Sequence, residues 1–358
     1  MKGENTMKHP LRMLSSLLTL ALISTLGVGC SQNPSKSSSA SGAALAESNL
    51  DSVIYRLSVV QAVNDPVTKA AMEFAENVKE KTEGRVVVEV YPANQLGDTL
   101  SVFDEIMRGT IDMAYAPPAD NYEPDIYLSF LPFLATSYDD LSRIYGKEGY
   151  LFQESEKLYQ KLGIKLLGYG TIGFLGVGAS KPVVDENKKA LKNVLVRTSS
   201  DLLSKLTMEG MGFNVSTMPY VDVFSGLQTG IIDGWLGGNP SINYFSFRDV
   251  IQYYYHYKII MENNHFYINQ KSFEKMSAED QAAFEDCAEE MFRKSYEDAQ
   301  ALDEQYLKEL SDFGITVVEF TDAEMDEMAR NVRENVWPKI GGDKYSAEFI
   351  ENLKNSLS

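Results

Sequence analysis

The sequence predicts an α/β protein with largely parallel sheets, because segments of strand character alternate with segments of helical spacing. Residues 56–61 and 86–90 have the β-branched content and length of strands. Between them, Asp65 and Pro66 stand where an N-cap and a first helical residue belong. A strand, a helix and a second strand in this order predict a right-handed crossover. Because residues 51–358 exceed the usual size of one domain, two lobes are expected.

The same alternation continues toward the middle of the chain. A helix is expected at 99–108, ending at Gly109, and a short strand at 111–114. The apolar segment 124–134 is interrupted by Pro132, which favours buried irregular structure over a regular helix.

Five glycines between 168 and 178 follow a strand expected at 165–169. No helix opens from this run, so its spacing does not match a dinucleotide-binding loop. The expected elements beyond it are a strand at 194–196, a helix at 201–208, a short helix from 222 to 230 and a strand beginning at 231.

The strongest helix signal lies in the C-terminal third of the chain. Residues 277–313 contain no Gly or Pro, and Ser277 is well placed as the N-cap of one long helix. A strand is expected at 315–320. Thr321 and Glu324 then have the spacing of a capping box, which predicts a last helix.

The N-terminus indicates an export signal. Three cations precede an apolar stretch at 13–26 that is too short to span a bilayer, and small residues lead from it to Cys30. We therefore expect residues 1–29 to be cleaved and Cys30 to carry lipid. The Ser/Ala-rich segment 30–50 would form a flexible tether on the extracytoplasmic side of the cell membrane. The alternative is an ordinary signal peptide with an incidental Cys30, because Leu26 stands four positions before the cysteine and not three.

Charge and residue usage exclude several classes of function. The formal net charge of −18 becomes −20 after loss of residues 1–29, which disfavours nucleic acid as a partner. The three histidines have no zinc-ligand spacing, and no phosphate-binding loop, calcium loop or nucleophile motif occurs. No metal, cofactor or enzyme activity is therefore expected. An anionic ligand would need a locally positive pocket on this acidic body.

Two blocks of sequence resemble the extracytoplasmic solute-binding proteins of TRAP transporters, of the C4-dicarboxylate-binding type. The first, 66–113, contains a Q-L-G turn and a G-x-x-D-M strand in the order typical of that family. The second, 191–240, contains a strand ending at Arg197 and then the run L-Q-T-G-I-I-D-G. With the long helix, the resemblance covers roughly residues 53–340.

The resemblance implies a periplasmic-binding-protein-like fold of class II type. Two α/β lobes would flank a ligand cleft and be joined by crossing strands and a long helix. Lobe I would comprise residues 51–170 and about 265–304, and lobe II residues 171–264 and about 305–358. The implied partners are a small carboxylate and the membrane subunits of a TRAP transporter, to which closure of the lobes would deliver the ligand.

Arg197 is the residue that the resemblance assigns to the ligand carboxylate. Its planar guanidinium can donate two parallel hydrogen bonds to a carboxylate, which an ammonium group cannot reproduce. The alternative is that Arg197 pairs with a neighbouring acidic side chain of the protein.

The sequence departs from the family pattern at two places. Sialic-acid-binding members carry a second arginine where this chain reads Gly170, Thr171 and Ile172, so a smaller or more apolar substrate is expected. The stretch DGWLGGNP is two residues longer than the family's D-G-x-x-N-P, which leaves open whether Asn239 is in register with the family asparagine.

Further candidates for ligand contact lie near strand ends or in loops, where side chains would line the cleft. The alternative for the aromatic candidates is a position in the core. The alternative for Asn64 and Gln95 is a turn or capping role. The full set of candidates is Asn64, Gln95, Tyr115, Tyr169, Thr171, Phe174, Tyr220, Phe224, Trp235 and Asn239.

Two other functions stay open from the sequence. A binding protein that serves a sensor or another class of transporter would share the same lobes and cleft. A surface enzyme or structural lipoprotein could also have adopted this fold.

Overall fold

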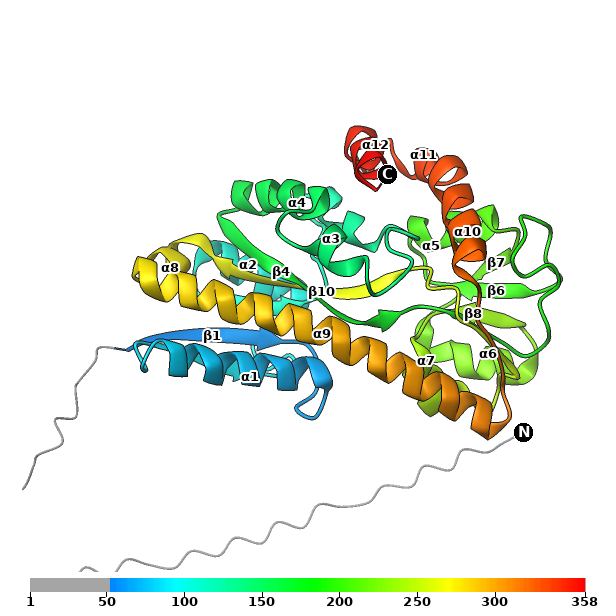
Figure 1. Ribbon diagram of the computed structural model, residues 1–358, viewed down its shortest axis with the longest axis horizontal. Coiled ribbons are helices and arrows are strands. Elements are labelled where there is room, and N and C mark those ends of the chain that lie inside the picture. The colour runs from blue at the N-terminus through cyan, green and yellow to red at the C-terminus, as the bar shows by residue number, and fades with distance from the viewer. Residues whose placement is uncertain (1–51, 358) are drawn as a thin grey trace, which may run out of the picture. The chain divides into compact units, whose positions relative to one another are not determined.

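Two β-sheets organise residues 52–357, the part of the chain that the computed structural model describes (Figure 1). The predicted signal, the lipidation site Cys30 and the whole tether at 30–50 lie outside the described residues. The first sheet has the strand order β2-β1-β3-β10-β4, and the second has the order β11-β9-β5-β8-β6-β7. The strands of the first sheet are β1 (Val53–Val59), β2 (Val86–Tyr91), β3 (Met113–Ala116), β4 (Ile164–Phe174) and β10 (Met261–Asn269). Those of the second are β5 (Val177–Ala179), β6 (Leu195–Thr198), β7 (Asn214–Thr217), β8 (Gly234–Leu236), β9 (Tyr253–Tyr255) and β11 (Thr316–Val318).

Helices cover both sheets. Those between the strands of the first sheet, in chain order, are α1 (Pro66–Lys81), α2 (Thr99–Arg108), the 3-10 helix η1 (Pro124–Phe130), α3 (Leu141–Tyr145) and α4 (Tyr150–Lys161). Those between the strands of the second sheet are α5 (Leu202–Gly210), the 3-10 helix η2 (Tyr220–Asp222), α6 (Val223–Thr229), α7 (Pro240–Ile242) and the π-helix η3 (Asn243–Phe247). The chain then adds α8 (Gln270–Glu274), α9 (Ala278–Phe313), α10 (Asp322–Asn335), α11 (Trp337–Ile340) and α12 (Ala347–Ser356).

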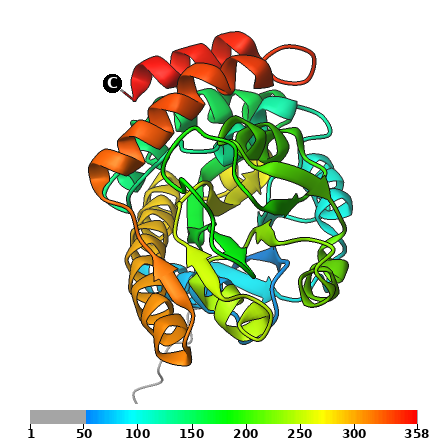
Figure 2. The same cartoon turned by 90° about the vertical axis from the view of Figure 1, so that its right-hand side faces the viewer.

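The two halves are joined by two strand crossings and one long helix. The chain passes to the second sheet between β4 and β5, and it returns between β9 and β10, which pairs antiparallel with β4. Helix α9 packs along β4 and reaches α7 and β11 of the second half (Figure 1). Figure 2 shows α9 and the last helices on different sides of the second sheet. This is the predicted two-lobed α/β fold, and the predicted strand-helix-strand unit is present because β1 pairs parallel with β2.

Helix α1 shows how local sequence and packing agree. The Asp65 side chain accepts a hydrogen bond from the backbone N–H of Val67, and Pro66 occupies the first turn, as predicted. Phe74 is fully buried and its ring meets the rings of Phe266 and Phe284 edge to face at 4.9 and 5.0 Å. Truncation of such a buried ring costs about 3–5 kcal/mol, so Phe74 fixes α1 against the first sheet and α9.

Helix α9 has the predicted length and ends. The Ser277 hydroxyl accepts from the backbone N–H of Asp280, and Gly314 closes the helix with a left-handed φ of 106°. The capping box of Thr321 and Glu324 also forms as predicted. These signals are local, since each depends on side chains within one helical turn.

Strand β4 differs from the expectation, because it runs through the glycines to Phe174 and does not end at 169. The glycines let neighbouring groups approach the strand closely. A Cβ atom at Gly168 would lie 2.1 Å from the Phe292 ring, and one at Gly170 would lie 1.7 Å from the Tyr115 hydroxyl oxygen. The glycine run is therefore a packing surface within the strand.

Several elements were not anticipated from the sequence: α3, α4, β7, α11 and α12. The C-terminal helices contact the half that holds the first sheet, since α12 packs on α4 and the Trp337 indole N–H donates to the Pro132 carbonyl at 3.0 Å. The expected lobe limits assigned residues 305–358 to the other lobe, and those limits stay a prediction. No helix within residues 52–357 is long and apolar enough to cross a membrane.

Candidate functional site

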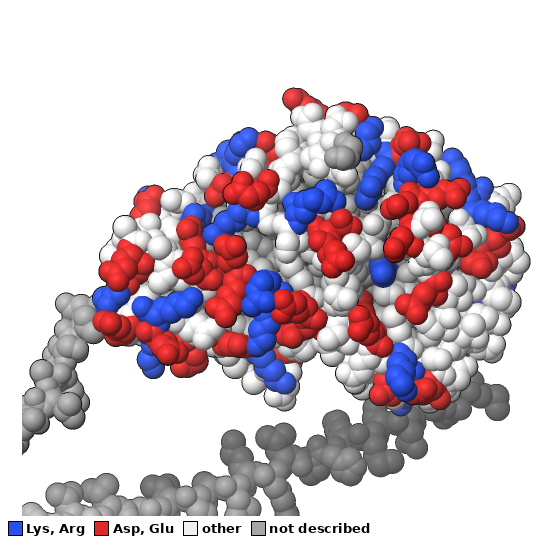
Figure 3. All heavy atoms as spheres, in the orientation of Figure 1, with Lys and Arg blue, Asp and Glu red and all other residues white. Residues whose placement is uncertain are grey.

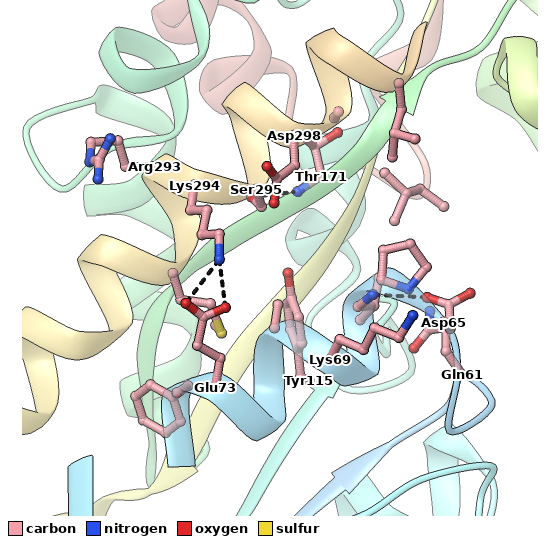
Figure 4. Close-up of a pocket in the computed structure, with 18 of the residues that line it drawn as sticks. Gln61, Asp65, Lys69, Glu73, Tyr115, Thr171, Arg293, Lys294, Ser295 and Asp298 are labelled. Atoms are coloured by element: carbon pink, nitrogen blue, oxygen red, sulfur yellow. Dashed lines mark hydrogen bonds and ion pairs between the residues drawn. The ribbon is translucent and has the colours of Figure 1, made fainter. Parts of the chain in front are cut away.

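The predicted site residues fall into two regions. One is a pocket of about 480 Å³ bounded by α1, α9, β4 and α7, which Tyr115, Thr171 and Asn239 line (Figure 4). The other surrounds Arg197, at the C-terminal end of β6, and does not contribute to the pocket lining. We call the first region the α9 pocket and define the second below as the Arg197 cluster.

The Tyr115 ring fills the floor of the α9 pocket. It comes from β3, is almost fully buried and packs edge to face on Phe266 at 5.5 Å. Its hydroxyl lies against Gly170 of β4, where any larger residue would collide with it. Burial raises the pKa of Tyr115 well above its usual range, so the phenol stays protonated.

Thr171 reaches the α9 pocket, but its hydroxyl is occupied by the protein. It donates to the Glu262 carbonyl at 3.0 Å and accepts from the backbone N–H of Gly173 at 3.0 Å. The Thr171 backbone N–H donates to the Ser295 hydroxyl at 3.3 Å. Thr171 therefore ties β4 to β10 and α9, the three segments that join the two halves.

Asn239 also reaches the α9 pocket, and it is the N-cap of the short helix α7. Its amide oxygen accepts from the Ile242 N–H at 3.0 Å and from the Ser241 hydroxyl at 2.8 Å. Its amide nitrogen donates to the Ile172 carbonyl of β4 at 2.5 Å. The side chain therefore holds the second half against the crossing strand, and little hydrogen-bonding capacity is left for a ligand.

The charged groups at the rim of the α9 pocket are exposed and partly paired. Lys294 of α9 contacts Glu73 of α1 at 2.6 Å, and both side chains are about half exposed, so the pair adds little stability. Lys69 lies at the opposite rim near Asp65 (Figure 4). Acidic and basic side chains are interspersed over this face of the molecule (Figure 3), which gives the pocket no strong positive character.

Arg197 is the buried cation of the second region. Its side chain is only 6% exposed, and Nε donates to the Met218 carbonyl at 2.7 Å. Within residues 52–357 no carboxylate lies at ion-pair distance from it, and its two terminal nitrogens have no protein acceptor. No acidic side chain of the described chain therefore forms the ion pair with Arg197 that the alternative requires. Burial lowers the pKa of Arg197, yet a guanidinium stays charged at neutral pH.

Two aromatic residues near Arg197 behave differently. Tyr220 of η2 is 53% exposed and available to a ligand. Trp235 is 2% exposed, its ring stacks obliquely on Phe247 at 4.2 Å, and its N–H donates to Asn243 at 3.1 Å. Trp235 therefore occupies a core position with the Tyr220 ring centroid 5.9 Å away, and its contact with a ligand stays a prediction.

Other predicted contacts are also placed elsewhere. Tyr169 and Phe174 are fully buried, because the extended strand β4 turns them into the core against His265 at 4.7 Å and Tyr138 at 5.0 Å. Neither residue lines the α9 pocket, and their contact with a ligand stays a prediction. Three more candidates lie at the surface and do not line the α9 pocket: Asn64, Gln95 and Phe224.

Sequence reasoning missed Glu262 of β10. The residue is half-buried, and its carboxyl group has no hydrogen bond or ion pair to any residue of the described chain. Burial raises its pKa from 4.5 to about 7. The carboxyl lies within electrostatic range of Tyr127 of η1 and of Tyr220. The only feature of the sequence that could have pointed to Glu262 is its place as a single acidic residue in the segment IIMENNHFYIN.

We define the Arg197 cluster as Arg197, Tyr220, Glu262 and Tyr127. Its members come from β6, η2, β10 and η1, so both halves of the molecule contribute. Burial is the main cause that raises the pKa of Tyr220. The charge of Glu262 raises this pKa further, and the charge of Arg197 lowers it. An exposed tyrosine thus lies within electrostatic range of one largely buried cation and one partly buried acid.

The described residues show no group of three or more side chains that could hold a metal ion. His265 is fully buried, with its ring nitrogens 2.8 Å from the hydroxyl oxygens of Ser129 and Tyr159. Burial lowers its pKa to about 3, so it is a neutral core residue.

Comparison with known proteins agrees with this architecture. The family model described as bacterial extracellular solute-binding protein, family 7 (DctP) matches residues 57–341. The chain is 24% identical over 315 residues to the ectoine-binding periplasmic protein TeaA of Halomonas elongata, covering 82% of this chain and 86% of that protein. It is 26% identical over 312 residues to the C4-dicarboxylate-binding periplasmic protein DctP of Rhodobacter capsulatus, covering 82% and 90%.

A solved structure shows the same fold. The TRAP periplasmic solute-binding protein from Ochrobactrum anthropi superimposes with a TM-score of 0.75 at 22% identity, covering 86% of this chain and 95% of that one. The family match extends over most of the chain and includes both sheets and the long helix. The protein is therefore a member of the DctP family, the extracytoplasmic solute-binding proteins of TRAP transporters.

Proposed function

We propose that the protein captures a small carboxylate outside the cytoplasm at Arg197 and delivers it to a TRAP-type transporter by closure of its lobes. The observation that carries this proposal is a largely buried Arg197 side chain whose two terminal nitrogens have no acceptor in the described chain and are not themselves fully buried, so a ligand can reach them. A bidentate carboxylate would accept a hydrogen bond from each of the two nitrogens. The family membership and the carboxylate named for the Rhodobacter relative support the same ligand class.

Closure would follow from differential binding. A ligand that contacts both halves binds the closed arrangement more tightly, so it shifts the population toward that arrangement. Arg197 would hold the carboxylate from the second half, while Tyr127 would approach from the first. The crossings β4–β5 and β9–β10 and helix α9 would absorb the movement.

Lipidation of Cys30 is part of the proposal, since an anchored receptor would stay close to its transporter. The segment 31–50 has the composition of a flexible tether, which would let the folded part move above the membrane. Cys30→Ser is expected to move the protein from the membrane fraction to the soluble fraction of its host. Retention of this variant in the membrane would show that Cys30 is not the anchor.

The ligand class is tested by isothermal titration of the purified protein with succinate, pentanoate and succinamide. The charged ligands should bind wild type, and the uncharged diamide should not, because it cannot form a charge-assisted bidentate pair with Arg197. Arg197→Ala should lose the binding of both acids while keeping the circular dichroism spectrum and melting behaviour of a folded protein. Equal binding of succinamide and succinate to both proteins would overturn the carboxylate assignment.

A further inference from the structure

The α9 pocket has no role in the capture of a carboxylate at Arg197. Neither Arg197 nor Tyr220 lines it, yet its volume of about 480 Å³ is within the range of small-molecule sites. Its walls come from α1, α9, β4 and α7. A molecule in this pocket would therefore contact segments of both halves at once.

The floor and inner walls of the pocket are apolar. Phe74 of α1, Tyr115 of β3 and Met291 of α9 are buried side chains that line it. The other apolar lining residues are Val67, Ala70, Ile172, Ile242, Ala299 and Leu302. The removal of an apolar ligand body from water against these side chains would favour binding in proportion to the area covered.

The Tyr115 hydroxyl is an unused hydrogen-bond donor in this apolar wall. The Tyr115 side chain is 1% exposed, and within residues 52–357 no group forms a hydrogen bond with its hydroxyl. The hydroxyl oxygen is not itself fully buried, so a ligand can reach it. The ring stands between Lys294 and Lys69, with its hydroxyl pointing into the pocket (Figure 4). A buried phenol normally has a hydrogen-bond partner, and a ligand oxygen would supply one here.

The other hydroxyl groups of the wall direct their protons to the protein. Thr171 donates to the Glu262 carbonyl at 3.0 Å, and Ser295 donates to the Phe292 carbonyl at 2.7 Å. Ser241 donates to the Asn239 amide oxygen at 2.8 Å. Of the four hydroxyl groups that line the pocket, only that of Tyr115 therefore has a proton free for a ligand.

The charges at the rim of the pocket do not favour an ion of either sign. Lys294 is paired with Glu73 at 2.6 Å, and Arg293 is paired with Glu297 at 2.5 Å. The charged lining residues are the acids Asp65, Glu73, Glu290 and Asp298 and the bases Lys69, Arg293 and Lys294. Because a charged group on the apolar floor would lose water without a dedicated counter-charge, a neutral ligand is the better complement.

We infer that the α9 pocket is a second binding site, for a small uncharged molecule with an apolar body and an oxygen that accepts a hydrogen bond from Tyr115. The site is separate from the Arg197 cluster, so this inference does not depend on the proposed function. The competing arrangement is an anion held by Lys69 and Tyr115 together.

The test uses three probes of nearly equal size: acetophenone, ethylbenzene and benzoate. Ethylbenzene replaces the carbonyl group of acetophenone by a methylene group, and benzoate replaces its methyl group by a charged oxygen. Each probe is titrated at pH 7 into wild type and Arg197→Ala and followed by ligand-observed NMR. Acetophenone should bind both proteins with affinities within about twofold of each other, because Arg197 does not line the pocket.

Tyr115→Phe isolates the hydrogen bond. The variant keeps the ring and lacks the donor, so the affinity for acetophenone should fall at least about threefold. The affinity for ethylbenzene, which has no acceptor, should stay within about twofold of the wild-type value. A loss for both probes in equal measure would show that the pocket had collapsed and would contradict the hydrogen bond.

Ala70→Trp fills the pocket from α1, where Ala70 is half-buried. It should weaken the binding of both neutral probes at least about tenfold. Ala282→Trp places the same side chain at an exposed position of α9 that does not line the pocket, and it should bind both probes as wild type does. Melting curves of the variants check that they are folded.

Three results would overturn the inference. The first is the absence of acetophenone binding to wild type. The second is acetophenone binding that is lost in Arg197→Ala or retained in Ala70→Trp, since the probe would then occupy another place. The third is benzoate binding to Arg197→Ala that is as tight as the binding of acetophenone, since the pocket would then accept anions. Succinate binding that is lost in Arg197→Ala and kept in Ala70→Trp would support two separate sites.

Discussion

The α9 pocket and the Arg197 cluster differ in how their polar groups are satisfied. In the α9 pocket, Thr171 and Asn239 are fully engaged by the protein, and Lys294 is paired with Glu73. In the Arg197 cluster, the guanidinium ends and the Glu262 carboxyl have no partner in the described chain. The volume of the pocket is therefore a poorer guide to the ligand than the unpaired charges of the Arg197 cluster.

The largest expected effect is that of Arg197→Ala on carboxylate affinity. Removal of one partner of a buried, hydrogen-bonded charge pair costs about 2–5 kcal/mol, which corresponds to a loss of at least about thirtyfold. Lys69→Ala removes an exposed cation at the rim of the α9 pocket and should change affinity less than about threefold. Isothermal titration with succinate measures both, and a larger loss for Lys69→Ala would move the carboxylate site into the pocket.

The next effect concerns stability and pH at Glu262. Its pKa is about 7 in the folded protein and 4.5 as the ordinary value, so the folded state binds more protons in this window. Stability from this group is therefore complete below about pH 4.5 and is lost as pH rises through 7. Glu262→Gln should stabilise the unliganded protein on the order of 2 kcal/mol at pH 8 and scarcely at pH 4.5.

The difference in free energy of unfolding between Glu262→Gln and wild type separates the contribution of Glu262 from that of His265, which is the same in both proteins. The lowered pKa of His265, about 3, acts in the opposite direction, because its stability is present above pH 6.5 and is lost as pH falls. Denaturant unfolding of both proteins at a series of pH values checks the prediction. A stability difference that does not change with pH would show that Glu262 is not desolvated.

A smaller effect is expected at the floor of the α9 pocket. Gly170→Ala would place a Cβ atom 1.7 Å from the Tyr115 hydroxyl oxygen, so the ring must shift, at a cost of about 1–2 kcal/mol. Tyr115→Phe removes the colliding oxygen and should recover part of the loss in the double variant. Thermal unfolding of the two single variants and the double variant measures this coupling, and purely additive losses would contradict the assigned contact.

The smallest effect is that of Asn239→Ala, which removes the cap of α7 and the hydrogen bond to Ile172. Loss of a cap costs about 1 kcal/mol. Since the side chain already donates one hydrogen bond and accepts two within the protein, ligand affinity should fall less than about threefold. An affinity loss comparable to that of Arg197→Ala would show that Asn239 contacts the ligand directly.

The comparison of regions also shows what the sequence can and cannot predict. Elements fixed by local chemistry were anticipated, including the Asp65 cap, the breaker-free α9 and the capping box at Thr321. Helices α11 and α12 were missed because their place depends on long-range contacts, such as the hydrogen bond from Trp337 to Pro132.

The site shows the same division. Arg197 was singled out because it stands in a family motif, and its role as carboxylate site stays a prediction; the structure adds that its terminal nitrogens have no partner in the described chain. The burial of Trp235, Tyr169 and Phe174 was not anticipated, because strand position alone does not say which face of a strand meets the core. Glu262 was missed because the significance of a single acid in an apolar strand depends on the groups that the fold brings to it.

The most direct test of the proposed function is a crystal structure of the protein with succinate. We predict a ligand carboxylate on both terminal nitrogens of Arg197, at about 2.7–2.9 Å. The two sheets should also lie closer together than in the unliganded protein. A ligand bound by Lys69 in the α9 pocket, with Arg197 unoccupied, would contradict the central claim.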